Sequence, residues 1–342
     1  RDYVDENSRL LGRDWFDILW ITAAVCAVAA GCVLALDPFS KVWGAIPEAV
    51  KAILGVIILV GAITGLFGMA YKGGLKENKA KAVSYSKAVA AILVISLFVI
   101  FFWLGFEQAG GTMTLFAEEQ TNRNIFGWEM PASYFQSVNP IFIVLLAPLF
   151  SMMWTKIDGN PKTRLSVVYK MCIALCLLGL GFLLLYLGQS VVQQDASGAY
   201  IVKASPFFLV GVYFLHTCGE LCLSPIGLSL VTKLSPARMV SLMMGVWFLS
   251  SAGANYMAGN LEAFLHTYEI NIFAFLIGSS FAAAVLLFAI SPLLRSWMND
   301  KPGAAAAVAA DSTSDFDTDA TDDSFNAVDN ASESSESESK DH

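Results

Sequence analysis

The chain has 342 residues, of which 56% are apolar and only 15% are charged, and its mean hydropathy is +0.59. A soluble protein of this size carries about a quarter charged residues, so the composition excludes a set of soluble domains. Between Ile18 and Leu294, long stretches contain no charged residue. Each is about as long as the ~20 residues that a helix needs to cross a bilayer. The composition therefore predicts an all-α polytopic membrane protein.

Eight such stretches follow one another along the chain, and two of them are each interrupted by one glutamate. They are residues 18–36, 52–71, 88–117, 131–155, 171–189, 205–232, 239–261 and 270–294. Lysines and arginines concentrate before the first stretch, after the last, and in every second loop between them. Because cytoplasmic loops carry the excess of basic residues, we expect eight transmembrane helices with both ends of the chain in the cytoplasm.

The net charge of -8 and the pI near 4.9 come from the C-terminal tail. Residues 311–342 hold eleven acids and one lysine, a charge of -10, which leaves about +2 for the rest. A segment so rich in Ser, Asp and Glu buries too little apolar surface to fold. We therefore expect three parts: a transmembrane helix pair with a cytoplasmic linker over 1–87, a six-helix bundle over 88–301, and a disordered cytoplasmic tail over 302–342.

The sequence has no pattern that is typical of catalysis or of metal binding. All six cysteines lie in apolar stretches, where reduced cysteines pack like small apolar side chains. His216 and Ser224 are eight residues apart, which is about 12 Å along a helix and too far for a hydrogen bond. We expect no enzyme activity, no cofactor, no metal site and no nucleic-acid partner.

Glu107 is the first of two acidic residues inside the apolar stretches. A charged side chain at the centre of a membrane costs roughly 2.5–3.5 kcal/mol on insertion scales, so such residues face a cavity or a partner. Aromatic residues precede it, and Gly110 and Gly111 follow it. The two glycines permit close approach of another helix or local unwinding. This pattern favours a functional carboxylate over the alternative, a fixed salt bridge to another helix.

Glu220 is the second acid, near the middle of the sixth stretch. His216 and Ser224 lie four residues to either side of it, on the same face of a helix. Pro225 lacks a backbone N–H and clashes with the carbonyl of Leu221, so we predict a helix bend there. A carboxylate beside a bend suits a cationic ligand and a moving gate. For His216 alone, we favour a neutral histidine that is hydrogen-bonded between helices.

Four strings of residues also stand out: FWLGFEQ at 102–108, FQSVNP at 135–140, GELCLSPIGLSLVTKL at 219–234 and MMGVWF at 243–248. In this order they resemble the seventh, eighth, tenth and eleventh helices of the proton-dependent oligopeptide transporters, a branch of the major facilitator superfamily. The order and the spacing both match that family. The likeness extends from residue 88 to about residue 295.

This resemblance implies a fold made of two six-helix halves, between which prokaryotic members insert two extra helices. The first two stretches would be the inserted pair, and the other six would be the C-terminal half. The signature of the first half, Glu-x-x-Glu-Arg-Phe-x-Tyr-Tyr-Gly, occurs nowhere in the chain. We therefore expect a partial sequence that lacks the first six helices of a transporter in a bacterial plasma membrane.

The same resemblance implies roles for individual residues. Glu220 would bind the free amino group of a peptide, and Glu107 would couple protons through a switchable salt bridge to a basic residue of the missing half. Asn139, Ser224 and Trp247 match positions of the substrate pocket. Asn139 offers a donor and an acceptor, and Trp247 offers an aromatic wall. Simple helix packing is the alternative for Trp247, and an interhelical hydrogen bond is the alternative for Asn139.

The expected function is proton-coupled uptake of di- and tripeptides by alternating access. Its partners would be small peptides, protons, the lipid bilayer and the missing six-helix half. Two alternatives stay open. One is a facilitator that carries another small solute, and the other is a peptide sensor that signals through the acidic tail.

Overall fold

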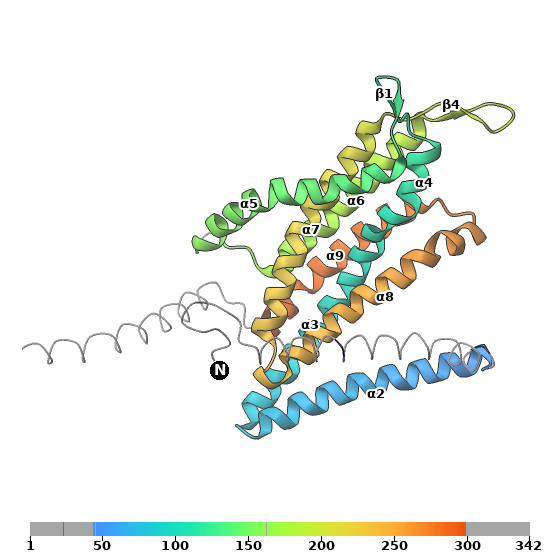
Figure 1. The fold of residues 1–342 in the computed structure, drawn as a ribbon. Coiled ribbons are helices and arrows are strands. Elements are labelled where there is room, and N and C mark those ends of the chain that lie inside the picture. The colour runs from blue at the N-terminus through green and yellow to red at the C-terminus, as the bar shows by residue number, and fades with distance from the viewer. Residues whose placement is uncertain (1–22, 24–43, 45, 162, 299–342) are drawn as a thin grey trace, which may run out of the picture. The chain divides into compact units, whose positions relative to one another are not determined.

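A computed structural model describes residues 23, 44, 46–161 and 163–298 of the chain (Figure 1). The chain forms two compact units, residues 1–68 and 69–342. In the first unit the structure describes most of helix α2, which runs from Glu48 to Leu75 and ends in the second unit. The predicted span at 18–36, apart from Ala23, and the predicted tail lie outside the described residues.

The second unit contains helices that match the remaining predicted spans. In chain order they are α3 (Lys79–Phe106), α4 (Thr112–Glu119), α5 (Val138–Gly159), α6 (Val167–Val191), α7 (Pro206–Leu234), α8 (Val240–Thr267) and α9 (Ile272–Trp297). Three 3-10 helices lie before α4, α5 and α8: η1 (Glu107–Gly110), η2 (Ala132–Ser137) and η3 (Ala237–Met239). Side chains of Asn78, Ser205 and Asn271 cap α3, α7 and α9 by accepting hydrogen bonds from first-turn N–H groups.

The core of the second unit lies where α3, α6, α7 and α9 meet. Helix α6 packs along both α7 and α9, while α3 packs against α8 and α9, and α5 packs against α7 (Figure 1). Glycine permits a close approach between α3 and α6, because a Cβ atom at Gly105 would lie 2.9 Å from Cδ2 of Leu178. Phe102 and Phe182 are fully buried beside this contact. The result is a closely packed contact between α3 and α6.

Six helical segments in the described part of the chain are long and apolar enough to cross a membrane. They are Ala49–Leu75, Lys79–Glu119, Ala132–Gly159, Val167–Val191, Pro206–Leu234 and Ile272–Trp297. Helix α8 has 28 residues but is not among them, because serines, glycines and asparagines lower its hydropathy. The predicted all-α polytopic fold is confirmed, whereas membrane crossing by α8 and by residues 18–36 stays a prediction. The predicted domain boundaries also stay predictions.

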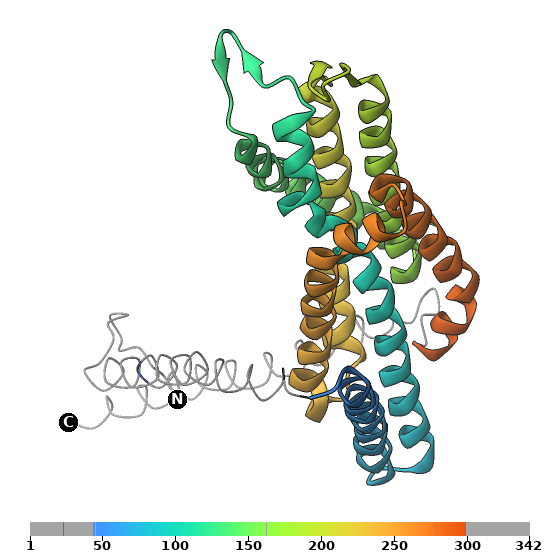
Figure 2. The ribbon, with the colours of Figure 1, turned by 90° about the vertical axis from the view of Figure 1, so that its right-hand side faces the viewer.

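Two short hairpins lie in the loops before α5 and α7, at the same end of the second unit (Figures 1 and 2). Strands β1 (Asn124–Ile125) and β2 (Trp128–Glu129) pair antiparallel, as do β3 (Gln193–Gln194) and β4 (Tyr200–Val202). The turn between β1 and β2 has two positive φ angles, 51° at Phe126 and 86° at Gly127.

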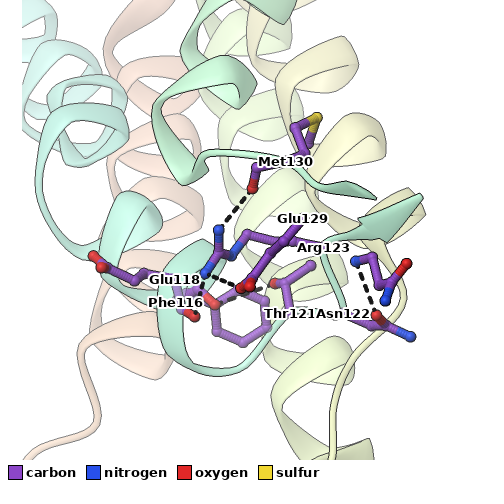
Figure 3. Close-up of polar contacts among 8 residues, drawn as sticks. Phe116, Glu118, Thr121, Asn122, Arg123, Glu129 and Met130 are labelled. Atoms are coloured by element: carbon purple, nitrogen blue, oxygen red, sulfur yellow. Dashed lines mark hydrogen bonds and ion pairs between the residues drawn. The ribbon is translucent and has the colours of Figure 1, made fainter. Parts of the chain in front are cut away.

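Arg123 holds the first hairpin closed (Figure 3). Its guanidinium donates to the carbonyl of Met130 at 2.6 Å and pairs with the carboxylate of Glu129 at 2.9 Å. Main-chain bonds tie the two loops together: the N–H of Asn122 donates to the carbonyl of Ala204 at 2.9 Å, and the N–H of Ala204 donates to Gln120 at 2.7 Å. These contacts join the C-terminal end of α4 to the start of α7.

Candidate functional site

Glu107 lies at a break in the third predicted span. Helix α3 ends at Phe106, Glu107 begins the 3-10 helix η1, and α4 starts only after Gly111, whose φ and ψ are -114° and -103°. Gly110 and Gly111 therefore mark a local change of helix type. This agrees with local unwinding, one of the two roles predicted for this glycine pair. The Glu107 side chain is partly buried. Among the described residues, its carboxylate has no hydrogen bond and no ion pair.

Glu220 lies on α7 and is held by a residue of α5. The amide Nδ2 of Asn139 donates to Oε2 of Glu220 at 3.1 Å and to the hydroxyl oxygen of Thr217 at 3.0 Å. Thr217 is fully buried, and its own hydroxyl donates to the carbonyl of Tyr213 at 2.6 Å. The family resemblance predicts that Asn139 and Glu220 share one pocket. It does not include Thr217, which lies three residues before Glu220.

The folding of α3 against α7 brings the two glutamates into one region. The rings of Phe106 and His216 lie 6.2 Å apart, and a Cβ atom at Gly219 would lie 3.2 Å from the Phe102 ring. Glu107 directly follows Phe106, and Glu220 directly follows Gly219.

His216 is part of the packing between α6 and α7. Its Nε2 lies 3.2 Å from the carbonyl oxygen of Leu178, and its ring lies 4.7 Å from that of Phe182. Gly181 makes room for the imidazole, because a Cβ atom there would lie 2.4 Å from the ring. The histidine is 2% exposed. The prediction of a histidine that is hydrogen-bonded between helices is therefore confirmed.

The remaining predicted site residues have mixed surroundings. The hydroxyl of Ser224 is buried and has no hydrogen-bond partner among the described residues. Trp247 is 3% exposed and packs on Gly227, where a Cβ atom would lie 2.2 Å from the indole ring. Helix α7 continues through Pro225. The pocket roles of Ser224 and Trp247 and the bend at Pro225 stay predictions.

A second polar cluster, next to Glu107, was not anticipated from the sequence. Gln108 is 2% exposed, and its amide donates to the carbonyls of Leu104, at 3.1 Å, and of Ala258 on α8, at 3.3 Å. The hydroxyl of Thr112 lies 2.9 Å from Oε1 of Gln108 and 3.0 Å from Oε2 of Glu262, also on α8. This cluster holds η1 and the start of α4 against α8.

Within the described residues, no group of three or more His, Cys, Asp or Glu side chains could hold a metal ion. The four cysteines of that part, Cys172, Cys176, Cys218 and Cys222, are free thiols, and three of them are buried. The polar groups of the predicted site and its contacts are the carboxyl groups of Glu107 and Glu220, the amide of Asn139, and the hydroxyl groups of Thr217 and Ser224.

Comparison with known proteins decides the family. A family model described as PTR2, POT family, matches residues 60–276. The chain belongs to the POT family. Its POT relatives include the peptide transporter YePEPT of Yersinia enterocolitica, which is 34% identical over 292 residues, 83% of this chain and 54% of YePEPT. The dipeptide and tripeptide permease A of Escherichia coli is 30% identical over 285 residues, 75% of this chain and 55% of the permease.

Solved structures of POT proteins have the same helical fold. A peptide transporter POT in complex with alafosfalin is 29% identical and superposes with a TM-score of 0.58, over 84% of this chain and 54% of that transporter. A structure in complex with sulfate is 27% identical, with the same TM-score and coverages of 84% and 55%. The POT resemblance of the sequence is thereby confirmed. This POT chain spans about half the length of the relatives that it matches.

Proposed function

We propose that this chain carries the substrate amino-group site and a proton-coupling carboxylate of a proton-coupled importer of di- and tripeptides. The names of the relatives, peptide transporter and dipeptide and tripeptide permease, support this substrate class. The membrane-spanning helices support a multi-pass location, which we propose to be a bacterial plasma membrane. One observation carries the proposal: the carboxylate of Glu220 and the amide of Asn139 form one polar site across α5 and α7.

The proposed substrate contact is between Glu220 and the ammonium group of a peptide. A carboxylate away from water binds a cation strongly, because the low local dielectric screens the attraction weakly. Asn139 already donates to Glu220 through its NH2 group. Its carbonyl oxygen, which accepts no hydrogen bond from the described residues, is available as a second acceptor. Ser224, one turn further along α7, and Trp247 are proposed to complete the pocket.

Glu107 is the proposed proton-coupling group. Its carboxylate is partly buried without a partner in the described residues, so either a proton or a basic side chain can neutralise it. We propose that a basic residue of a further six-helix half, of the kind that the longer relatives have room for, alternates with the proton. Rocking of the two halves around a midplane site would then expose the peptide to either side of the membrane.

Glu220→Ala tests the proposed substrate contact. In the full-length protein, the variant should raise the half-saturation concentration for dialanine at least about tenfold, the effect of losing one charge-assisted contact. The half-inhibitory concentration of N-acetyl-dialanine, which has no ammonium group, should change less than about twofold. Uptake into proteoliposomes measures both. Equal losses for the two peptides would mean that Glu220 supports the fold and does not bind the amino group.

A further inference from the structure

The buried hydroxyl group of Thr217 contacts the Asn139 amide of the proposed site. Thr217 lies on α7, three residues before Glu220, and it is fully buried. A threonine hydroxyl has one hydrogen to donate and two lone pairs that accept. Its hydrogen is committed to the carbonyl of Tyr213 at 2.6 Å. Towards Asn139, at 3.0 Å, the Thr217 oxygen is therefore only an acceptor.

This commitment fixes the orientation of the Asn139 amide. Both groups that contact Nδ2, the Thr217 oxygen and Oε2 of Glu220, accept hydrogen bonds, so they require the NH2 group and not the carbonyl. The two hydrogens of that group are then used. Among the described residues, the carbonyl oxygen of Asn139 accepts no hydrogen bond. It is the one group of the amide that is left for a ligand.

We propose that Thr217 is a positioning residue that keeps Asn139 an acceptor, so that the amide carbonyl and the Glu220 carboxylate together bind the substrate ammonium. This inference rests on the proposed function and adds a residue to it. When an ammonium approaches Glu220, it competes with the Asn139 contact to that carboxylate. The Thr217 contact then remains, and it prevents the amide from turning its NH2 group, a donor, towards the positive charge.

Thr217→Val and Thr217→Ser separate this role from packing. Valine has nearly the shape of threonine but no hydroxyl, so it removes the acceptor with little change of volume, whereas serine keeps the hydroxyl. The full-length protein in proteoliposomes is assayed by counterflow of dialanine without a proton gradient. Thr217→Val should raise the half-saturation concentration for dialanine about fivefold, the size of one hydrogen bond. Thr217→Ser should stay within about twofold of the parent protein.

Two further measurements show whether Thr217 acts through Asn139 on the amino group. Inhibition by N-acetyl-dialanine should be the same in Thr217→Val as in the parent. In an Asn139→Leu background, Thr217→Val should have no additional effect, because residues that act in one chain of contacts are not additive. The inference is wrong if Thr217→Val weakens the binding of both peptides equally, or if it still weakens the binding of dialanine in the Asn139→Leu background.

Thermal unfolding in detergent checks the fold of each variant, and the Glu220→Ala result separates this inference from the proposed function. If Glu220→Ala weakens dialanine selectively and Thr217→Val does not, only the positioning role of Thr217 fails. If Glu220→Ala has no selective effect either, the amino-group site itself is wrong.

Discussion

Glu107 and Glu220 differ in the hydrogen-bond partners that the described residues give them. Glu220 receives a hydrogen bond from Asn139 at 3.1 Å, whereas the Glu107 carboxylate has no partner among the described residues. Burying an unpaired charge in a membrane is expensive, by several kcal/mol at the bilayer centre. A proton that binds Glu107 removes this cost, and so does a cation that approaches it. The unsatisfied carboxylate is therefore the one expected to change its state during transport.

Glu107→Gln should abolish uptake that is driven by a proton gradient, because the amide has nearly the shape of the carboxyl group but cannot exchange a proton. Exchange of internal for external peptide should remain, since it needs no net proton movement. Accumulation of labelled dialanine against its gradient, compared with counterflow, measures the two activities. Glu118→Gln, an exposed acid on α4, is the matched control and should lose neither. Accumulation by Glu107→Gln at the parent level would refute the coupling role.

At the scale of helices, α5 is held by polar contacts near both of its ends. None of its residues is buried, so apolar packing holds it less than it holds α6 or α7. Near its first turn, Asn139 is bonded to α7. Near its last turn, Asp158 pairs with Lys170 of α6 at 2.6 Å, and that ammonium also lies 4.4 Å from the ring of Trp154. The two ends of α5 are thus fixed by side chains of different helices.

Asp158→Asn should destabilise the protein because Lys170, whose side chain is 4% exposed, loses its counter-charge. Removing one partner of a fully buried pair costs about 3–5 kcal/mol. Asp158 is 41% exposed, so solvent screening reduces the expected loss to about 2 kcal/mol. Combining Asp158→Asn with Lys170→Met should recover most of this stability, because no buried charge is then left alone.

Thermal unfolding in detergent measures these differences. Glu129→Gln is the control: its partner Arg123 is 13% exposed but Glu129 itself is 70% exposed, so the loss should stay below about 1 kcal/mol. An Asp158→Asn variant as stable as the Glu129→Gln variant would show that the α5 contact does not contribute to stability.

At the scale of the whole molecule, charge and length predicted most of the fold. The predicted spans 171–189 and 205–232 became α6 and α7, each within four residues at either end. The length of a stretch without charged residues could not reveal the break at Glu107, where span 88–117 divides into α3, η1 and α4. The reason is that helix type depends on the backbone angles at Gly111. That length also could not reveal Thr217, because its bond to Asn139 depends on how α5 and α7 are rotated against each other.

The predicted orientation in the membrane is tested by labelling of single cysteines. In a variant that lacks the six native cysteines, Ala196→Cys in the loop between β3 and β4 should react with an impermeant maleimide applied outside the cell. Lys76→Cys, between α2 and α3, should react only after the membrane is opened, because its lysine-rich loop is expected inside. Both residues are exposed, so their local accessibility is matched. The opposite labelling pattern would invert the assignment.

The main-chain bonds between Asn122, Gln120 and Ala204 have a mechanical consequence. Gln120 directly follows the last residue of α4, and Ala204 precedes α7 by two positions. A displacement that separated the end of α4 from the start of α7 would have to break these hydrogen bonds. If the hydrogen bonds persist through the transport cycle, α4 and α7 move as one rigid body at this end. Any change in the distance between Glu107 and Glu220 must then come from the short η1 segment, which serves as the hinge.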